Sequence, residues 1–321
     1  MVFNITECVD FHHGKRIVIT ILVCGHDVVI IMHKEGDALL IQQPVYYPFR
    51  EVIEDNGRIF VNNQLHYEDG KYTIDFEDFE KKIVDNNVKV FILCNPHNPV
   101  GRVWTKEELE KMGDICLKHN VVIMDDEIHC DFTYPGFKFT SFMTLDEKYH
   151  NSLVLYTSPS KTFNVAGLQP ANIIIKNPEL RAAYRKANAA AGYSQGSIMG
   201  QVAVKSVYTK GDEWVNELVE YITGNMNYMR DFVKEYFPKA QFVDPEGTYL
   251  TWVDFSGYGF YREEFRAHLW VEEAHLWLDS GKVFGPATAQ FERFNLACPR
   301  ATVVKAMEQL KAALDNHTKW A

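Results

Sequence analysis

The sequence predicts an α/β protein with a mainly parallel sheet, followed by a smaller α+β region. Short apolar runs alternate with amphipathic helical patterns from about residue 88. Three of these runs end in polar turns, where parallel sheets bind their ligands. Past about residue 205, one long helical pattern precedes short strands. We therefore expect a large domain over residues 34–205, a small domain over residues 206–321 and an unassigned segment over residues 1–33.

The composition is that of a globular protein. The chain has 321 residues, which is enough to bury a sizeable core. Apolar residues make up 46% and charged residues 24%, which excludes the disordered and fibrous classes. Acidic residues outnumber basic residues by 43 to 33, so the formal net charge is −10. Such a surface repels phosphate backbones, and we expect no nucleic-acid partner.

The six cysteines indicate neither a zinc site nor a disulfide framework, because they form no CxxC pair and are irregularly spaced. Scattered single cysteines are typical of a reducing compartment, so we expect a cytoplasmic protein. The apolar run at residues 17–24 follows Lys15 and Arg16, as in an export signal. It is too short to span a membrane, and neither export nor a membrane partner is expected.

Three apolar, β-branched runs are the predicted strands of the large domain. They cover residues 88–94, 121–124 and 153–156, and residues 173–175 are a candidate fourth strand. Strands that alternate with helices pair in parallel, so we expect parallel pairing here.

A helix is predicted to begin at Thr105, after the first of these strands. Glu108 lies three residues on and completes a capping box. Leu109, Met112 and Cys116 share one face of this helix, which we expect to be buried.

The small domain is predicted from five further segments. Residues 212–236 form a long helix, residues 249–255 a strand, and residues 263–276 a helix. A strand around residues 294–297 and a last helix over residues 301–314 complete it. The apolar side of the long helix is expected to carry Trp214, Leu218, Tyr221 and Ile222.

Polar side chains follow all three predicted strands. Asn98 offers an amide, Asp126 a carboxylate, and Lys161 an amine flanked by Ser158 and Ser160. Any one of them alone is typical of a solvated turn, but three equivalent positions indicate a site. These are the groups that pyridoxal phosphate needs. The lysine forms a Schiff base, the acid keeps the pyridine nitrogen protonated, the amide contacts the phenolate oxygen, and the hydroxyls suit the phosphate.

Three ordered motifs resemble the fold-type I pyridoxal phosphate enzymes of the class I/II aminotransferase superfamily. They are NPHNPVG at residues 95–101, DEIH at residues 126–129 and SPSKTFN at residues 158–164. The resemblance extends from about Lys34 to the C-terminus. It implies a fold-type I large domain, pyridoxal 5'-phosphate as the cofactor, and a homodimer whose active sites lie at the subunit interface.

Further motifs are similar to those of the MalY/PatB-type carbon–sulfur β-lyases, which include cystathionine β-lyases. These motifs are DEIH, GLQ at residues 167–169 and NLACPR at residues 295–300. Many aminotransferases place a phosphate-binding arginine eight residues after the lysine, where this chain has Gln169. The β-lyase subgroup shares this glutamine.

The resemblance assigns the central roles residue by residue. Lys161 would bind the cofactor covalently and act as acid and base on the substrate Cα. Asp126 would pair with the pyridine nitrogen, and Asp125 is the neighbouring alternative. Asn98 would contact the phenolate oxygen. The acidic cluster at residues 125–131 needs no metal beside such a motif, so we expect no metal site.

Other positions match cofactor- and substrate-binding residues of the family. Tyr46 would stack on the cofactor ring, with Tyr47 as the less favoured neighbour. Ser158 would hold the phosphate, and His129 stands where many aminotransferases have a tyrosine near the phenolate oxygen. A further match, Arg293, would bind the substrate α-carboxylate through its guanidinium fork, with Arg300 as the fallback.

The first 33 residues do not match the family. Family members have there an arm that crosses to the partner subunit and a glycine turn that binds the phosphate. We interpret Met1–His33 as a truncated, out-of-frame or divergent start that impairs the cofactor site.

The predicted reaction is β-elimination from an L-amino acid with sulfur on Cβ, such as cystathionine, giving pyruvate, ammonia and a thiol. Transamination is the alternative, because the same residues serve it. A catalytically impaired remnant is the second alternative.

Overall fold

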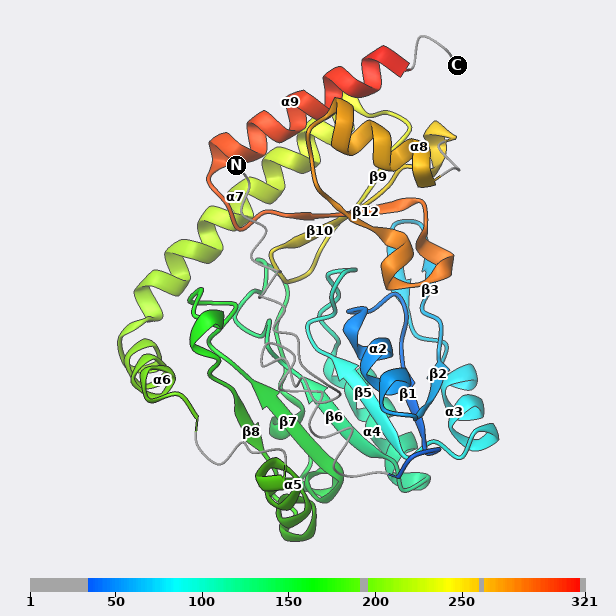
Figure 1. Cartoon of the computed structure of the whole chain (residues 1–321), viewed down its shortest axis with the longest axis vertical. Coiled ribbons are helices and arrows are strands. Elements are labelled where there is room, and N and C mark those ends of the chain that lie inside the picture. The colour runs from blue at the N-terminus through cyan, green and yellow to red at the C-terminus, as the bar shows by residue number, and fades with distance from the viewer. Residues whose placement is uncertain (1–33, 191–195, 260–262, 318–321) are drawn as a thin grey trace.

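A computed structural model describes residues 34–190, 196–259 and 263–317. Figure 1 shows two layered regions, a six-stranded sheet flanked by helices and a four-stranded sheet covered by α7, α8 and α9. The predicted start at Met1–His33 lies outside the described residues. The domain division at residues 205 and 206 stays a prediction.

The large sheet is mainly parallel, as predicted. Its strand order is β2-β1-β5-β6-β7-β8, and every neighbouring pair is parallel except β7 and β8. The strands are β1 (Ala38–Ile41), β2 (Ile59–Asn62), β5 (Val90–Cys94), β6 (Val122–Asp126), β7 (Leu153–Thr157) and β8 (Asn172–Ile174).

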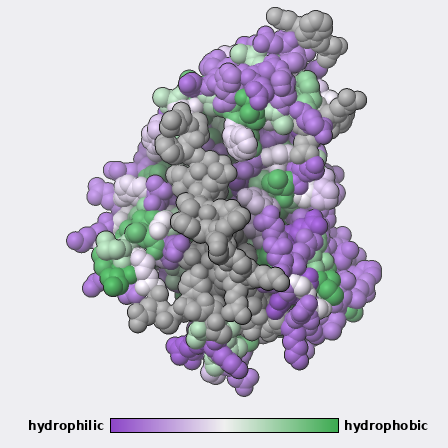
Figure 2. Space-filling view, viewed as in Figure 1, coloured by the Kyte–Doolittle hydropathy of each residue, from purple (hydrophilic) through white to green (hydrophobic). Residues whose placement is uncertain are grey.

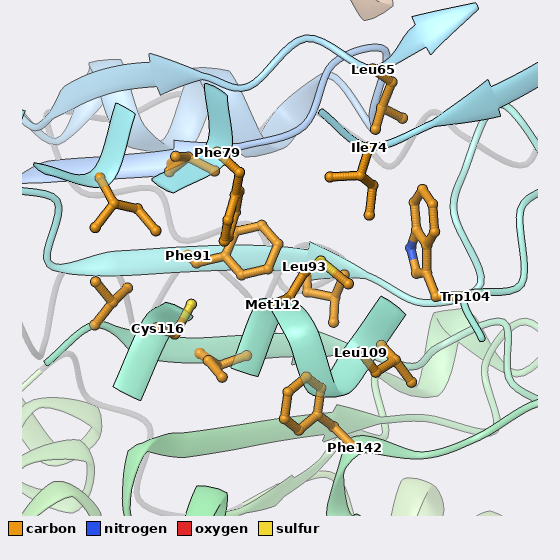
Figure 3. Close-up of a cluster of buried hydrophobic side chains, with 14 of the residues drawn as sticks. Leu65, Ile74, Phe79, Phe91, Leu93, Trp104, Leu109, Met112, Cys116 and Phe142 are labelled. Carbon is orange, nitrogen blue, oxygen red and sulfur yellow. The ribbon is translucent and has the colours of Figure 1, made fainter. Parts of the chain in front are cut away.

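Helices and a hairpin cover this sheet, and the core lies between them. Figure 3 shows Phe91 and Leu93 of β5 packed against Phe79 of α3 and Met112 of α4. Burial of such side chains contributes about 1.5–3 kcal/mol each. The covering elements are α2 (Pro48–Asp55), α3 (Phe76–Asp85), α4 (Lys106–Lys118), α5 (Pro178–Ala190), β3 (His66–Glu68) and β4 (Lys71–Thr73).

The structure confirms the predicted start of α4. The Thr105 side chain accepts the Glu108 N–H at 3.2 Å, and the Glu108 carboxylate accepts the Thr105 N–H at 2.8 Å. Leu109, Met112 and Cys116 are fully buried on one face. The capping box therefore sets where this helix begins, just after the loop that carries Asn98.

The second sheet is antiparallel, with the order β11-β12-β10-β9. In Figure 1, α9 lies along α7 on the outer side of this sheet. The elements are α6 (Ile198–Lys210), α7 (Asp212–Tyr236), β9 (Gln241–Val243), β10 (Leu250–Asp254), α8 (Glu263–His268), β11 (Asp279–Ser280), β12 (Phe291–Asn295) and α9 (Arg300–His317).

Four details differ from the sequence predictions. The strand expected around residues 294–297 begins three residues earlier and is β12, Phe291–Asn295. β8 runs antiparallel to β7, because residues 158–171 connect the two strands through a loop and a short 3₁₀ turn without a crossover α-helix. On α7, Trp214 and Tyr221 are about half exposed, and the buried side runs from Ile222 towards the C-terminal end. The helix expected at residues 263–276 ends as α8 and continues as a π turn over Leu269–Glu273.

Among the described residues, the structure contains no helix that is both long and apolar enough to cross a membrane.

Candidate cofactor and substrate site

The three polar segments come together at the carboxyl edge of the large sheet. Cys94, at the end of β5, pairs with Asp126 at the end of β6, and Asp126 pairs in turn with Tyr156 of β7. The loops that follow β5 and β7 carry Asn98 and Lys161. Parallel pairing of adjacent strands therefore places all three loops side by side.

Asp126 is a half-buried carboxylate that interacts electrostatically with the Lys161 ammonium group. Its Oδ1 accepts the backbone N–H of Ile128 at 3.1 Å. Burial raises the pKa of Asp126 to about 6, while the Ile128 N–H and the Lys161 ammonium favour its ionised form. A cationic hydrogen-bond donor would stabilise the ionised form of this carboxylate against the cost of its burial.

Asp125, the alternative position, lies in a different environment. Its side chain is fully buried beside the carboxyl group of Glu127, and neither of its carboxylate oxygens has a hydrogen-bond partner among the described residues. Burial and the Glu127 charge raise the pKa of Asp125 well above its usual range. Glu127 also accepts the Phe142 N–H at 2.9 Å, which ties this acid pair to the protein interior. This environment favours Asp126 as the acid of the site.

Arg293 of β12, in the antiparallel sheet, hydrogen-bonds to Asn98 in the loop after β5 of the large sheet. The Arg293 Nη1 donates to Asn98 Oδ1 at 3.0 Å, and both side chains are buried. The guanidinium lies 4.8 Å from the centre of the Phe284 ring. Its Nη2 donates to the carboxylate of Asp279. The amide oxygen of Asn98 is thus engaged, which leaves its NH₂ group to donate to a ligand.

Arg300, the fallback for carboxylate binding, lies elsewhere. Its Nε donates to Asn225 of α7 at 2.6 Å, and its backbone N–H donates to the Tyr221 hydroxyl at 2.7 Å. These contacts hold the start of α9 against α7. Of the two arginines, Arg293 is the one that the structure brings to Asn98.

Two aromatic side chains border the same charged groups. Burial raises the pKa of the Tyr46 phenol, on which the charges of Arg293 and Asp126 also act. His129 is buried, its ring centre lies 5.3 Å from that of Tyr249, and its Nδ1 has no partner among the described residues. Burial lowers the pKa of His129 to about 3, with smaller contributions from the Lys161 and Arg293 charges. The imidazole is therefore neutral at pH 7.

The loop that carries Lys161 is held by its own hydroxyl groups. Ser158 Oγ lies 2.8 Å from Ser160 Oγ and 2.5 Å from the Pro170 carbonyl oxygen. Beside the lysine, the buried hydroxyl of Thr162 donates to Asp131 at 2.6 Å.

Sequence reasoning missed Asp279, Phe284 and the Thr162–Asp131 bond. The latter joins the SPSKTFN motif to Asp131 of the acidic cluster at residues 125–131, two segments that the sequence did single out. Asp279 and Phe284 carried none, because only the antiparallel sheet brings them to Arg293.

The groups present fit pyridoxal phosphate. The half-buried Asp126 carboxylate suits a protonated ring nitrogen, and the unpartnered Nδ1 of His129 and the NH₂ group of Asn98 remain for a polar ligand. Lys161 lies close enough for its charge to act on both Asp126 and His129.

A mostly parallel sheet whose strand ends gather a lysine, a carboxylate and an amide defines the class of fold-type I, pyridoxal-phosphate-dependent enzymes. Residues 24–310 match the family described as aminotransferase class I and II, and the chain belongs to this family. The predicted resemblance and its cofactor are thereby confirmed.

Named relatives narrow the likeness to carbon–sulfur lyases. The chain is 40% identical to cystathionine beta-lyase PatB of Bacillus subtilis (strain 168) over 279 residues, which cover 87% of this chain and 72% of the relative. It is 30% identical to protein MalY of Escherichia coli (strain K12) over 283 residues, covering 87% of this chain and 71% of that protein.

Two crystal structures show the same likeness. Cystalysin from Treponema denticola, which contains pyridoxal 5'-phosphate, superposes with a TM-score of 0.90 at 36% identity, covering 92% of this chain and 75% of cystalysin. The pyridoxal-phosphate-bound C–S lyase from Staphylococcus hominis superposes with a TM-score of 0.82 at 33% identity, covering 92% of this chain and 74% of that one.

Proposed function

We propose that this protein is a pyridoxal-phosphate-dependent carbon–sulfur β-lyase that acts on cystathionine- or cysteine-type L-amino acids. The observation that carries the proposal is the 40% identity to a cystathionine β-lyase over 87% of the chain. The site supports it, because Asp126, Lys161, Asn98 and Arg293 lie together at the sheet edge.

When bound, pyridoxal phosphate would supply an electron sink that takes up the electrons of the substrate Cα–H bond and returns them as the thiolate leaves Cβ with the electrons of the Cβ–S bond. Asp126 keeps a proton on the ring nitrogen, which its half-buried carboxylate favours. Lys161 binds the cofactor and moves the proton at the substrate Cα. The NH₂ group of Asn98 donates to the phenolate oxygen, since Arg293 already engages its Oδ1.

The remaining site residues bind and orient the substrate and the cofactor. Arg293 receives the substrate α-carboxylate through its guanidinium fork. Tyr46 stacks on the cofactor ring, and His129 lies near the phenolate side as a neutral imidazole. Ser158 would have to turn its hydroxyl from the Pro170 carbonyl towards a phosphate oxygen, and its contact with Ser160 keeps the two hydroxyls together for that role.

Transamination is the competing reaction at such a site, because the same residues serve both. His129 and Gln169 favour β-elimination through the likeness to the lyase subgroup. We expect the holoenzyme to release pyruvate and a thiol from cystathionine faster than it transfers the amino group to a keto acid. Faster half-transamination than pyruvate release would contradict the lyase assignment.

A cytoplasmic homodimer is part of the proposal. Figure 2 shows hydrophobic residues gathered over α6, where Ile198, Met199 and Val202 are 78%, 63% and 55% exposed. Exposed apolar patches of this kind mark protein interfaces. The described cysteines carry no disulfide, which supports a reducing compartment. Sedimentation of the holoenzyme tests the dimer, and a monomer at micromolar concentration would contradict it.

A further inference from the structure

Arg293 already contacts a carboxylate of the chain itself. Asp279 of β11 is paired with Arg293 of β12 in the antiparallel register, and the Arg293 Nη2 donates to Asp279 Oδ2. The arginine side chain is 7% exposed, whereas that of Asp279 is 31% exposed. The aspartate is therefore the more accessible member of the ion pair.

The other contacts of Arg293 hold the guanidinium in place. Nη1 donates to Asn98 at 3.0 Å, and the planar group lies over the Phe284 ring. A guanidinium fork is best matched by a carboxylate. Asp279 is thus an intramolecular partner of the same chemical kind as the α-carboxylate of an amino acid.

We propose that Asp279 competes with the substrate carboxylate for Arg293 and thereby sets the affinity of this site for carboxylates. The inference rests on the proposed role of Arg293 in carboxylate binding. An incoming carboxylate must share the guanidinium with Asp279 or replace it, and the negative charge of Asp279 repels it at close range. The pair therefore weakens the binding of every ligand that Arg293 recognises through a carboxylate.

The test is Asp279→Asn in the holoenzyme, with 3-(methylthio)propionate as the probe. This thioether carboxylate has no amino group, so it cannot exchange with Lys161 and reports on carboxylate binding alone. Titration calorimetry should give a dissociation constant lower by about two- to tenfold in the variant. The KM for an L-cysteine S-conjugate should fall by a similar factor while kcat stays nearly constant.

Matched variants separate competition from a structural role. Asp315→Asn removes an equally charged partner from an exposed ion pair with Lys311 on α9 and should leave probe binding unchanged. The double variant Asp279→Asn/Arg293→Gln should bind the probe no more tightly than Arg293→Gln alone, because the gain in affinity requires the arginine. Asp279→Ser, measured in the same way, serves if the asparagine variant folds poorly.

Unchanged or weaker probe binding in both Asp279 variants would overturn the proposal, because Asp279 would then only orient Arg293. A gain that survives in the double variant would also overturn it. Tighter probe binding without any lyase turnover by the wild type would support the proposal while refuting the proposed reaction.

Discussion

Replacing Asp126 with asparagine removes a carboxylate whose ionised form burial disfavours. Burial raises the pKa of Asp126 from its usual 3.8 to about 6, against the opposing effects of the Ile128 N–H and the Lys161 charge. A rise of this size corresponds to about 3 kcal/mol against the ionised form. Because the folded-state pKa lies above the unfolded one, this cost is absent below about pH 4 and complete above about pH 6.

We therefore expect Asp126→Asn to stabilise the cofactor-free protein at pH 8, by at most about 3 kcal/mol. The asparagine oxygen can still accept the Ile128 N–H, so the local turn is kept. The gain should shrink at pH 5, where the wild-type carboxyl is largely protonated. Urea unfolding of both cofactor-free proteins at the two pH values measures it. A variant that is less stable than the wild type at pH 8 would refute the burial argument.

The same substitution should slow the holoenzyme. The proposed charged hydrogen bond to the ring nitrogen is worth about 1.5–3 kcal/mol, which corresponds to a ten- to hundredfold loss of pyruvate release. Asp125→Asn is the matched control, because burial and Glu127 raise the pKa of Asp125 and the substitution changes little charge there. Equal losses of turnover in the two variants would show that the assignment of Asp126 is wrong.

Three further predictions test the other assignments. Borohydride reduction of the holoenzyme should leave the pyridoxyl group on Lys161, and peptide mapping that finds it on another lysine would exclude this residue. Arg293→Lys should raise KM by about tenfold or more through loss of the bidentate fork, and a change confined to kcat would contradict carboxylate binding. If residues 1–33 lack the phosphate-binding turn, two missing hydrogen bonds at about 1.5–3 kcal/mol each should weaken cofactor binding by about two to four powers of ten. Tight, stoichiometric titration of the cofactor-free protein would show instead that this segment completes the site.

Much of the large sheet could be predicted from sequence because its signals are local. The capping box at Thr105 and Glu108 fixes the start of α4 through two hydrogen bonds within four residues. β5 is a continuous apolar run, and β6 and β7 begin with such runs, as strands buried on both faces do. The α-helix α4 between β5 and β6 predicts their parallel pairing, and the long connection between β6 and β7, which contains only 3₁₀ turns, also leads to a parallel pair. These pairings bring Asn98, Asp126 and Lys161 to one edge of the sheet.

Contacts that depend on the tertiary fold were not predictable in this way. β11 has only two residues, too few for any periodicity, and the pairing of Asp279 with Arg293 exists only within the antiparallel sheet. The sequence of α7 shows which residues are apolar along one side of the helix. It does not show how much of that side α9 and the second sheet cover. α9 and the second sheet bury Ile222 and the residues after it, while Trp214 stays about half exposed near the other end.

The three consecutive acids at the end of β6 show how a strand separates residues that composition cannot distinguish. Side chains alternate along a strand, so Asp125 and Glu127 project to one side and Asp126 to the other. The two on the first side are buried together and Glu127 accepts the Phe142 N–H, whereas the Lys161 charge acts on Asp126. The residues on one side of the strand end therefore pack in the protein interior, and the residue on the other side lies in the candidate site. A shift of one residue in the β6 register would exchange these roles, because it would bury Asp126 and turn Asp125 and Glu127 towards the lysine.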